Sequence, residues 1–532
     1  MARGRMSKKK TWLVAGLLVS GIIAPALALD TSVSEVGIQA KKLRDAPYNL
    51  TGRKIGIGQV EIGRPGKFGL DKAVAWNPAL EVAGVFHRDT PAKSNTFVDN
   101  HASMVAAVMV SSDKKLEGVA PDARLYSSAV GSLRRSGQPE ECLSSQHVAL
   151  QNGGDVRAIN FSFGESLQRD PREEPTLDGN ALLTQCVDWS ARVHDTLYVI
   201  AGNQGQGGIP IPTDNFNGIS TAYTRMFEGG FNKVDFGNLS ALPEGIGRLL
   251  IQREINAGAR RAISLVAPGH QIAVINLEGE ILRVTGTSFA APHITASVAL
   301  LQEYGDRQLK KLQPNWSLDS RRHEVTKAVL LNSADKIKDD GDGLLLGMSR
   351  TTYAKDNHTW LEGDAYRDPK IPLDIEMGTG HLNAFRAYEQ FSGGQSDPQA
   401  PVVNRAWDYR EVEAGKYHDY VLEKPLQKDS FASITLAWDR LVELNDENDN
   451  KQFDVGEDFN DRGLNNLDIY LMSADSDDIR RSICASVSEV DSVEHIFCKV
   501  PETGRYKIRV HYRQQVNEAT QAYGLAWWTL GE

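Results

Sequence analysis

Short apolar runs alternate with amphipathic segments over residues 54–391 of the chain. The runs have the length and composition of buried strands and lie at 54–59, 157–163 and 197–201, the last two ending at Gly164 and Gly202. The segments with apolar residues at helical spacing are 101–110, 287–304 and 325–334. This alternation predicts an α/β domain, a parallel sheet covered by helices. Polar residues just after the strands are then the candidates for chemistry, because the active crevice of such sheets lies beyond the carboxyl ends of the strands.

The pattern changes after residue 396. Residues 395–401 are polar and contain two prolines, which is typical of a linker. Beyond them apolar and polar residues alternate, as at Ile434, Leu436 and Trp438 and again at Tyr506, Ile508, Val510 and Tyr512. Alternation between turn-rich segments predicts an antiparallel β-sandwich. A chain of 532 residues exceeds what one core usually supports, so we expect domains at 29–396 and 397–532.

The N-terminus has the pattern of an export signal. A basic stretch at 3–10 precedes an apolar run that ends near residue 24, and Ala26 and Ala28 flank one position as a signal peptidase requires. A membrane anchor is the alternative, but the run is short for a bilayer span of about 20 residues. We expect residues 1–28 to be removed and the mature protein to be secreted or periplasmic, without a membrane association.

Four cysteines fit an oxidising compartment. Their spacing does not match a zinc site, and among the three possible connectivities we expect the disulfides Cys142–Cys186 and Cys484–Cys498. The formal net charge of −10 argues against a nucleic-acid partner, which would need a basic face.

The strongest chemical signal is at residues 286–292, which read Gly-Thr-Ser-Phe-Ala-Ala-Pro and open an apolar helix. A serine at a helix start lies beside free backbone N–H groups that stabilise a developing oxyanion. In isolation, a helix cap at Ser288 or Thr287 would be the favoured interpretation, but this serine does not stand alone. A second helix opens with His101, in the segment Asp-Asn-His at 99–101.

Further signatures lie between and after these two. They are Gly-Val-Ala-Pro at 118–121, Ala-Gly-Asn at 201–203, Val-Ala-Pro-Gly at 266–269 and Gly-Thr-Gly-His at 378–381. In this order the segments resemble the subtilase family of serine peptidases over residues 55–387. A serine α/β-hydrolase is disfavoured, because its Gly-x-Ser-x-Gly elbow is absent around Ser288 and its triad runs in another order.

The resemblance implies hydrolysis of protein or peptide substrates by acyl transfer. Ser288 would be the nucleophile, His101 its general base, and Asn203 an oxyanion donor with the Ser288 N–H. Chemistry of this kind needs no cofactor. The resemblance also implies substrate-binding segments, at Ser162, Phe163 and Gly164 and at Ala201 and Gly202.

The third triad member departs from the family pattern. The family expects aspartate at the end of the first strand, and this chain has Glu61 there. Glutamate orients histidine in some other hydrolases, but its extra methylene changes its reach. Asp99 is an alternative acid. A catalytically impaired protein that binds peptides is therefore the competing hypothesis to an active serine endopeptidase.

The C-terminal region resembles the β-sandwich appended to some secreted subtilases. Within it, six residues follow the 1-3-5-7-9-12 spacing of a calcium loop: Asp446, Asn448, Asn450, Gln452, Asp454 and Glu457. Lys451 stands where such loops have glycine. A structural Ca²⁺ site and a solvated acidic loop are the two interpretations that this spacing allows.

Overall fold

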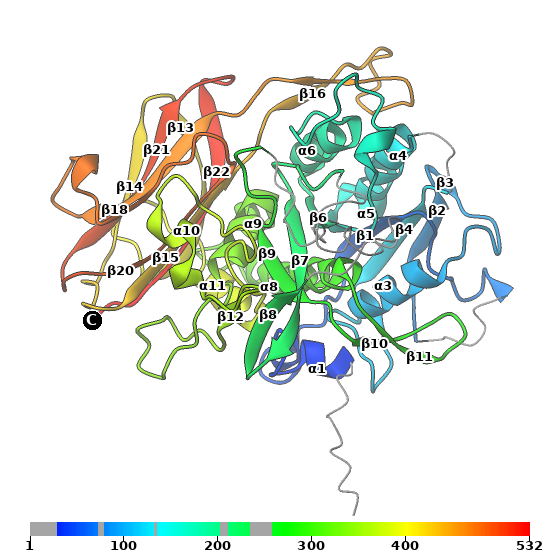
Figure 1. Cartoon of the computed structure of the whole chain (residues 1–532), viewed down its shortest axis with the longest axis horizontal. Helices are drawn as coiled ribbons and strands as arrows, with labels where there is room; N and C mark the ends of the chain where they lie inside the picture. Colours follow the sequence, from blue (N-terminus) through cyan, green and yellow to red (C-terminus); the bar gives the residue numbers. More distant parts are fainter. Residues whose placement is uncertain (1–28, 73–78, 132–135, 203–210, 235–257) are drawn as a thin grey trace, which may run out of the picture.

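A ten-stranded sheet forms the centre of the N-terminal part of the chain in the computed structural model, which describes residues 29–72, 79–131, 136–202, 211–234 and 258–532 (Figure 1). The strands lie in the order β12-β8-β7-β6-β5-β1-β4-β2-β3, with β9 paired to β7. They are β1 (Gly56–Glu61), β2 (Gly84–His87), β3 (Thr90–Pro91), β4 (Arg124–Ala129), β5 (Val156–Phe161), β6 (Leu197–Ala201), β7 (Ile219–Phe227), β8 (Gly230–Val234), β9 (Leu265–Pro268) and β12 (Thr352–Tyr353). Six adjacent strands, in the order β7-β6-β5-β1-β4-β2, are parallel to one another, as the alternating pattern predicts.

Helices cover both faces of this sheet. In β6, Val199 belongs to a core with α3 and α8, whereas Tyr198 and Ile200 belong to a core with α4 and α6. Successive strand residues point to opposite faces, so the two helix pairs form separate layers. The helices are α1 (Leu29–Val33), α2 (Ala40–Arg44), α3 (Asn100–Val110), α4 (Gln138–Ala149), α5 (Gln151–Gly154), α6 (Leu182–His194), α8 (Ala291–Lys310), α9 (His323–Asn332), α10 (Asp364–Arg367) and α11 (Ala384–Ser392). The hairpin of β10 (Ile272–Ile275) and β11 (Ile281–Val284) precedes α8.

The C-terminal part is an antiparallel β-sandwich, as predicted. One sheet has the order β13-β22-β15-β20 and the other β14-β21-β18-β19, and their facing side chains form a separate core. The strands are β13 (Arg405–Glu413), β14 (Tyr417–Val421), β15 (Phe431–Trp438), β18 (Asn466–Ser473), β19 (Cys484–Ser486), β20 (Val493–Lys499), β21 (Tyr506–Gln514) and β22 (Thr520–Thr529). The pair β16 (Val442–Leu444) and β17 (Phe459–Asp461) extends from it towards α6 (Figure 1).

Both expected disulfides are present, Cys142–Cys186 between α4 and α6 and Cys484–Cys498 between β19 and β20. The predicted signal peptide lies outside the described residues. Within the described ranges no helix is long and apolar enough to cross a membrane.

Helix α9 lies between the sheet of the first part and the sandwich, and every one of its residues is buried. The polar face of β15 bonds to it: Ser433 and Thr435 donate to Asn332 Oδ1 at 2.9 and 3.1 Å. On β22, a Cβ at residue 524 would come within 2.5 Å of the Glu324 backbone, so Gly524 permits this close approach. The strand β15 is thus buried on both faces.

A buried ion pair also joins the two parts. The Arg440 guanidinium, just after β15, donates to Asp188 Oδ2 of α6 at 2.7 Å, and both side chains are almost fully buried. Asp188 Oδ1 accepts from the backbone N–H groups of Phe216 and Asn217 at 2.9 Å each. Burial raises the pKa of Asp188, and Arg440 opposes this shift.

Replacing Arg440 by methionine is expected to lower the free energy of unfolding by about 3–5 kcal/mol, because it removes the cation that is hydrogen-bonded to the buried Asp188 carboxylate. Urea unfolding of a Ser288→Ala background, which prevents self-digestion, measures this loss. In the matched control, Arg462→Met breaks an ion pair with Glu443 in which both side chains are about half exposed, and should cost less than about 1 kcal/mol. Equal losses in the two variants would contradict the role assigned to the buried pair.

Candidate active site

Ser288 lies in a single 3₁₀ turn, Thr287–Phe289, immediately before α8. Gly286 has φ 150°, a backbone conformation that side chains rarely adopt, and it turns the chain from β11 into this 3₁₀ turn. Ser288 is partly exposed, and its hydroxyl does not cap the helix. Within the described parts of the chain, the Ser288 N–H has no hydrogen-bond acceptor. Ser288 therefore does not cap the helix, the alternative role that its position in the sequence allows.

The hydroxyl groups of Ser288 and Ser162 are bonded reciprocally to each other's backbone. Ser288 Oγ donates to the Ser162 carbonyl at 3.2 Å, and Ser162 Oγ donates to the Ser288 carbonyl at 2.9 Å. The buried Asn160 amide donates to Ser162 Oγ at 2.8 Å. These bonds attach the serine turn to the carboxyl end of β5, where the parallel-sheet pattern places an active crevice.

His101 is the second residue of α3 and lies beside the serine turn. Its ring packs edge-on against Phe289, the residue after Ser288, with ring centroids 5.6 Å apart. Its Nδ1 lies 2.8 Å from Glu61 Oε2, at the end of β1. Glu61 is 3% exposed, whereas 37% of the His101 side chain is accessible. The structure thus brings together Ser288, His101 and Glu61, from three separate segments.

Backbone bonds set the distance between Glu61 and His101. The chain leaving β1 pairs with the chain entering α3: the Arg64 N–H donates to the Phe97 carbonyl at 2.8 Å, and the Asp99 N–H donates to the Arg64 carbonyl at 2.9 Å. A Cβ at residue 63 would lie 2.2 Å from Asp99 Cβ, so the two segments can pass this closely only at Gly63.

Asp99, the alternative acid, has a different task. Its Oδ1 accepts from the Ala102 N–H at 2.8 Å and caps α3. The contact geometry therefore favours Glu61 over Asp99 as the group that orients the imidazole.

The charge of Glu61 also acts on the acidity of His101. Burial lowers the pKa of His101, but the Glu61 charge and hydrogen bond, together with the charge of Asp99, outweigh it and leave the pKa raised. A carboxylate that holds Nδ1–H leaves Nε2 as the site that accepts a proton.

Gln59 is a site residue that the sequence reasoning did not single out. It precedes Glu61 by two positions, so both side chains leave β1 on the same face. The fully buried Gln59 amide donates to Glu61 Oε1 at 3.2 Å and to the Ala102 carbonyl at 2.9 Å. Its own Oε1 has no partner among the described residues. The signal available in the sequence was an uncharged polar residue inside a buried strand.

The predicted substrate-binding residues follow β5 and end β6. Ser162 and Phe163 are buried and Gly164 is partly exposed; among the described residues, the backbone N–H and carbonyl of Phe163 and Gly164 form no hydrogen bonds. Ala201 ends β6, and the Gly202 N–H donates to the Thr221 carbonyl at 3.0 Å. Asn203, the predicted oxyanion donor, lies outside the described residues.

The predicted calcium loop connects β16 and β17. Asp454 Oδ2 accepts from the side-chain amides of Asn448 and Asn450, and Asp446 accepts from the backbone N–H of Asn450 and Lys451. Lys451 has φ 62°, so it adopts the left-handed conformation for which such loops use glycine. In the described residues, three ligand atoms from His, Cys, Asp or Glu lie within 4.8 Å of one another at one place, and that place is not this loop. The carboxylates of the loop therefore do not converge that closely.

Comparison with known proteins adds the family. The model of the subtilase family matches residues 80–350, half of the chain, including His101 and Ser288. The chain belongs to the subtilase family. The match begins after Glu61, so the assignment of the acid depends on the contacts described above.

Curated relatives match this subtilase at low identity. The major intracellular serine protease of Bacillus subtilis (strain 168) is 25% identical over 233 residues, 42% of this chain and 63% of the relative. Subtilisin Savinase of Lederbergia lenta is 25% identical over 270 residues, 50% of this chain and 84% of the relative. The alkaline protease of Alkalihalobacillus alcalophilus is matched over 59% of its length, so the chain spans less than two thirds of some relatives. Among solved structures, the prenylagaramide maturation protease PagA matches with a TM-score of 0.41 at 20% identity, over 66% of this chain and 97% of PagA.

Gln59→Leu is expected to lower kcat for a chromogenic peptide by up to about 100-fold, with little change in KM, because Glu61 loses the bond that fixes its free oxygen. Gln146→Leu is the matched control. It removes another buried amide, which bonds to the Phe453 backbone in the C-terminal part, and should lower stability but not kcat. Equal kcat values for the parent and Gln59→Leu would remove Gln59 from the positioning of Glu61.

Proposed function

We propose that this protein is an exported serine endopeptidase that hydrolyses peptide bonds through an acyl-enzyme intermediate. The observation that carries the proposal is the His101 ring, held by Glu61 at 2.8 Å on one side and packed beside the Ser288 turn on the other. Export is supported by the basic and apolar N-terminal sequence and by the two disulfides.

In the proposed mechanism, Ser288 Oγ attacks the carbonyl carbon of the scissile bond. His101 Nε2 takes the hydroxyl proton and later returns it to the leaving amine, while Glu61 stabilises the imidazolium. The Ser288 N–H, which has no acceptor in the described parts of the chain, stabilises the oxyanion together with Asn203. The Ser288 hydroxyl first leaves the Ser162 carbonyl, by rotation about the Cα–Cβ bond, to reach His101. Catalytic hydrogen bonds often form only when substrate is bound.

The substrate lies along the end of β5 in this proposal. The backbone groups of Phe163 and Gly164 form no hydrogen bonds with the described residues and would pair with an extended peptide, while Ala201 and Gly202 form the neighbouring wall. We place the boundary between the peptidase domain and the sandwich at 396/397, between the end of α11 and the start of β13.

The second candidate function is peptide binding without efficient turnover. It is favoured by one observation, the Ser288 hydroxyl bonded to the Ser162 carbonyl instead of to His101. The two functions differ in whether Ser288 is activated.

A fluorophosphonate probe tests this directly, because it labels a serine whose hydroxyl is activated by its base. We expect stoichiometric labelling of the mature protein, none in Ser288→Ala, and labelling slowed by orders of magnitude in Glu61→Gln, with ~10⁴ as the scale for loss of the orienting carboxylate. Glu61→Asp keeps the carboxylate and should retain measurable activity.

Glu61→Gln also removes the charge that raises the pKa of His101, so the acid limb of its pH–rate profile should move to lower pH.

Absence of labelling in the parent would support peptide binding without turnover. If Glu61→Gln labels as fast as the parent, another residue orients His101.

We further propose that the loop of residues 446–457 binds a structural Ca²⁺, for which its ligand spacing and the left-handed Lys451 are the support. A chelator is then expected to lower the melting temperature, because the bound ion offsets repulsion among Asp446, Asp454 and Glu457. Scanning calorimetry with Ca²⁺ and with chelator measures the shift, and Asp454→Asn should reduce it. Identical melting curves would identify a solvated loop.

A further inference from the structure

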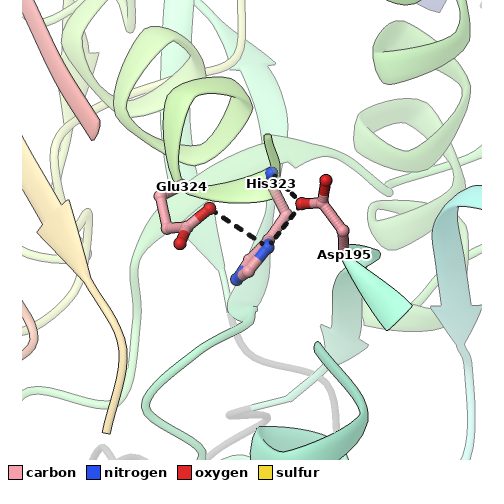
Figure 2. Close-up of side chains that lie close together, drawn as sticks. All are labelled: Asp195, His323 and Glu324. Carbon is pink, nitrogen blue, oxygen red and sulfur yellow. Dashed lines mark hydrogen bonds and ion pairs between the residues drawn. The ribbon is translucent and has the colours of Figure 1, made fainter. Parts of the chain in front are cut away.

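Three segments meet at the buried His323, and Figure 2 shows two of them, through Asp195 and Glu324. Asp195 directly follows α6, His323 and Glu324 begin α9, and Asp439 directly follows β15 of the sandwich. His323, Glu324 and Asp439 are 3%, 6% and 5% exposed. The group is separate from Glu61, His101 and Ser288, and the proposed peptidase mechanism makes no use of it.

Both ring nitrogens of His323 face carboxylates. Nδ1 lies 3.0 Å from Asp195 Oδ1 and 3.2 Å from Glu324 Oε2, and the three atoms lie within 4.8 Å of one another. Nε2 lies 3.1 Å from both oxygens of Asp439. Figure 2 shows Nδ1 between the Asp195 and Glu324 carboxylates.

One hydrogen cannot satisfy both carboxylates at Nδ1. The hydrogen bond from Nδ1 goes to Asp195 Oδ1, which also accepts from the His323 backbone N–H at 2.9 Å. Glu324 Oε2 is buried and has no hydrogen-bond partner among the described residues. A buried carboxylate oxygen without a hydrogen bond costs free energy. Glu324 Oε2 has a close contact with His323 Nδ1, 3.2 Å away, but the hydrogen there is bonded to Asp195, so a positive group bound among the three atoms would stabilise Glu324.

The neighbouring cations do not supply that group. Lys327 Nζ donates to the Phe216 carbonyl at 2.6 Å, and an Arg322 nitrogen lies 3.7 Å from Asp195 Oδ2. Neither cation therefore contacts Glu324 Oε2, and the carboxylates of Asp195, Glu324 and Asp439 surround one histidine ring.

We propose that His323 Nδ1, Asp195 Oδ1 and Glu324 Oε2 bind a zinc ion at the junction of the peptidase domain and the sandwich. Ligand atoms about 2.0–2.2 Å from a tetrahedral zinc lie roughly 3.3–3.6 Å from one another. The two separations measured from Nδ1, 3.0 and 3.2 Å, would widen by a few tenths of an ångström to admit the ion. A mixed nitrogen and oxygen set favours zinc over calcium, which takes oxygen ligands.

Asp439 is the positioning residue of this site. With the metal on Nδ1, Nε2–H donates to Asp439, and a carboxylate in this position fixes the ring and raises its basicity. Because Asp439 belongs to the sandwich and the three ligands to the peptidase domain, zinc binding and domain contact are coupled.

Zinc titration of the full mature chain carrying Ser288→Ala tests the proposal without any reading of peptidase activity. The chelator-treated protein is returned to excess Ca²⁺, which occupies any calcium loop, and zinc binding is followed by calorimetry and by melting temperature. We expect one equivalent bound and a higher melting temperature. Glu324→Gln should weaken binding by ~100-fold or more, Asp439→Asn by ~10–100-fold, and the exposed control Glu423→Gln should leave it unchanged.

Two results would overturn the site: no zinc uptake by the parent, which leaves His323 as an imidazolium between Asp195 and Asp439, or uptake unaffected by Glu324→Gln. Substitution with Co²⁺ in the parent adds a measurement that does not depend on how well a variant folds. Intense visible bands of four-coordinate cobalt support the site, and the weak spectrum of octahedral cobalt contradicts it.

Discussion

The bond between His101 Nδ1 and Glu61 Oε2 is possible only because the end of β1 and the start of α3 are held side by side. Neither residue is near the other in sequence, and both side chains are short compared with the width of a strand-and-helix layer. The backbone bonds of Arg64 with Phe97 and Asp99, and the close passage at Gly63, place the two segments in register. Ser288 is brought to the same edge by β5, through its reciprocal bonds with Ser162. The candidate site thus depends on a junction of loops attached to a rigid parallel sheet.

A glutamate in the acid position creates a problem that aspartate does not have. Its additional rotatable bond allows more orientations of the carboxylate, and each unwanted orientation lowers the population that holds Nδ1–H. Gln59 restricts this freedom by bonding Glu61 Oε1 and, at the same time, the carbonyl of Ala102 next to His101. Gln59 Oε1, which has no partner among the residues that the structure describes, is a local cost of this arrangement. Such costs occur where function constrains the side chain more than stability does.

The sequence predicted the layers of the fold and three members of the candidate site, because these leave local patterns: buried runs, helical spacing, and short motifs at helix starts. It did not predict the bond of Gln59 to the Ala102 carbonyl or the reciprocal bonds of Ser162 and Ser288, because these join residues that are 43 and 126 positions apart. Nor did it predict the bond of Gln59 to Glu61, because no motif marks a buried amide two residues before the acid. The alternation in β15 correctly indicated a strand but not its burial on both faces, since only the position of α9 decides whether Ser433 and Thr435 meet water or Asn332. Asn203 illustrates another limit, because its motif names a candidate donor and the described residues do not include it.

The sandwich is attached through buried polar contacts that specify orientation. Arg440 with Asp188, Asn332 with the β15 hydroxyls, and Asp439 with His323 each demand one relative position of the two domains, whereas an apolar surface alone would tolerate sliding. All three contacts lie on α6 and α9, and among the described residues no sandwich side chain bonds to Glu61, His101 or Ser288. The sandwich can influence catalysis through the packing of α9 against β6, the strand whose end, at Ala201 and Gly202, forms a wall of the proposed substrate site. A second route runs through α4, whose Gln146 bonds to Phe453 and which packs against β1, the strand that ends at Glu61.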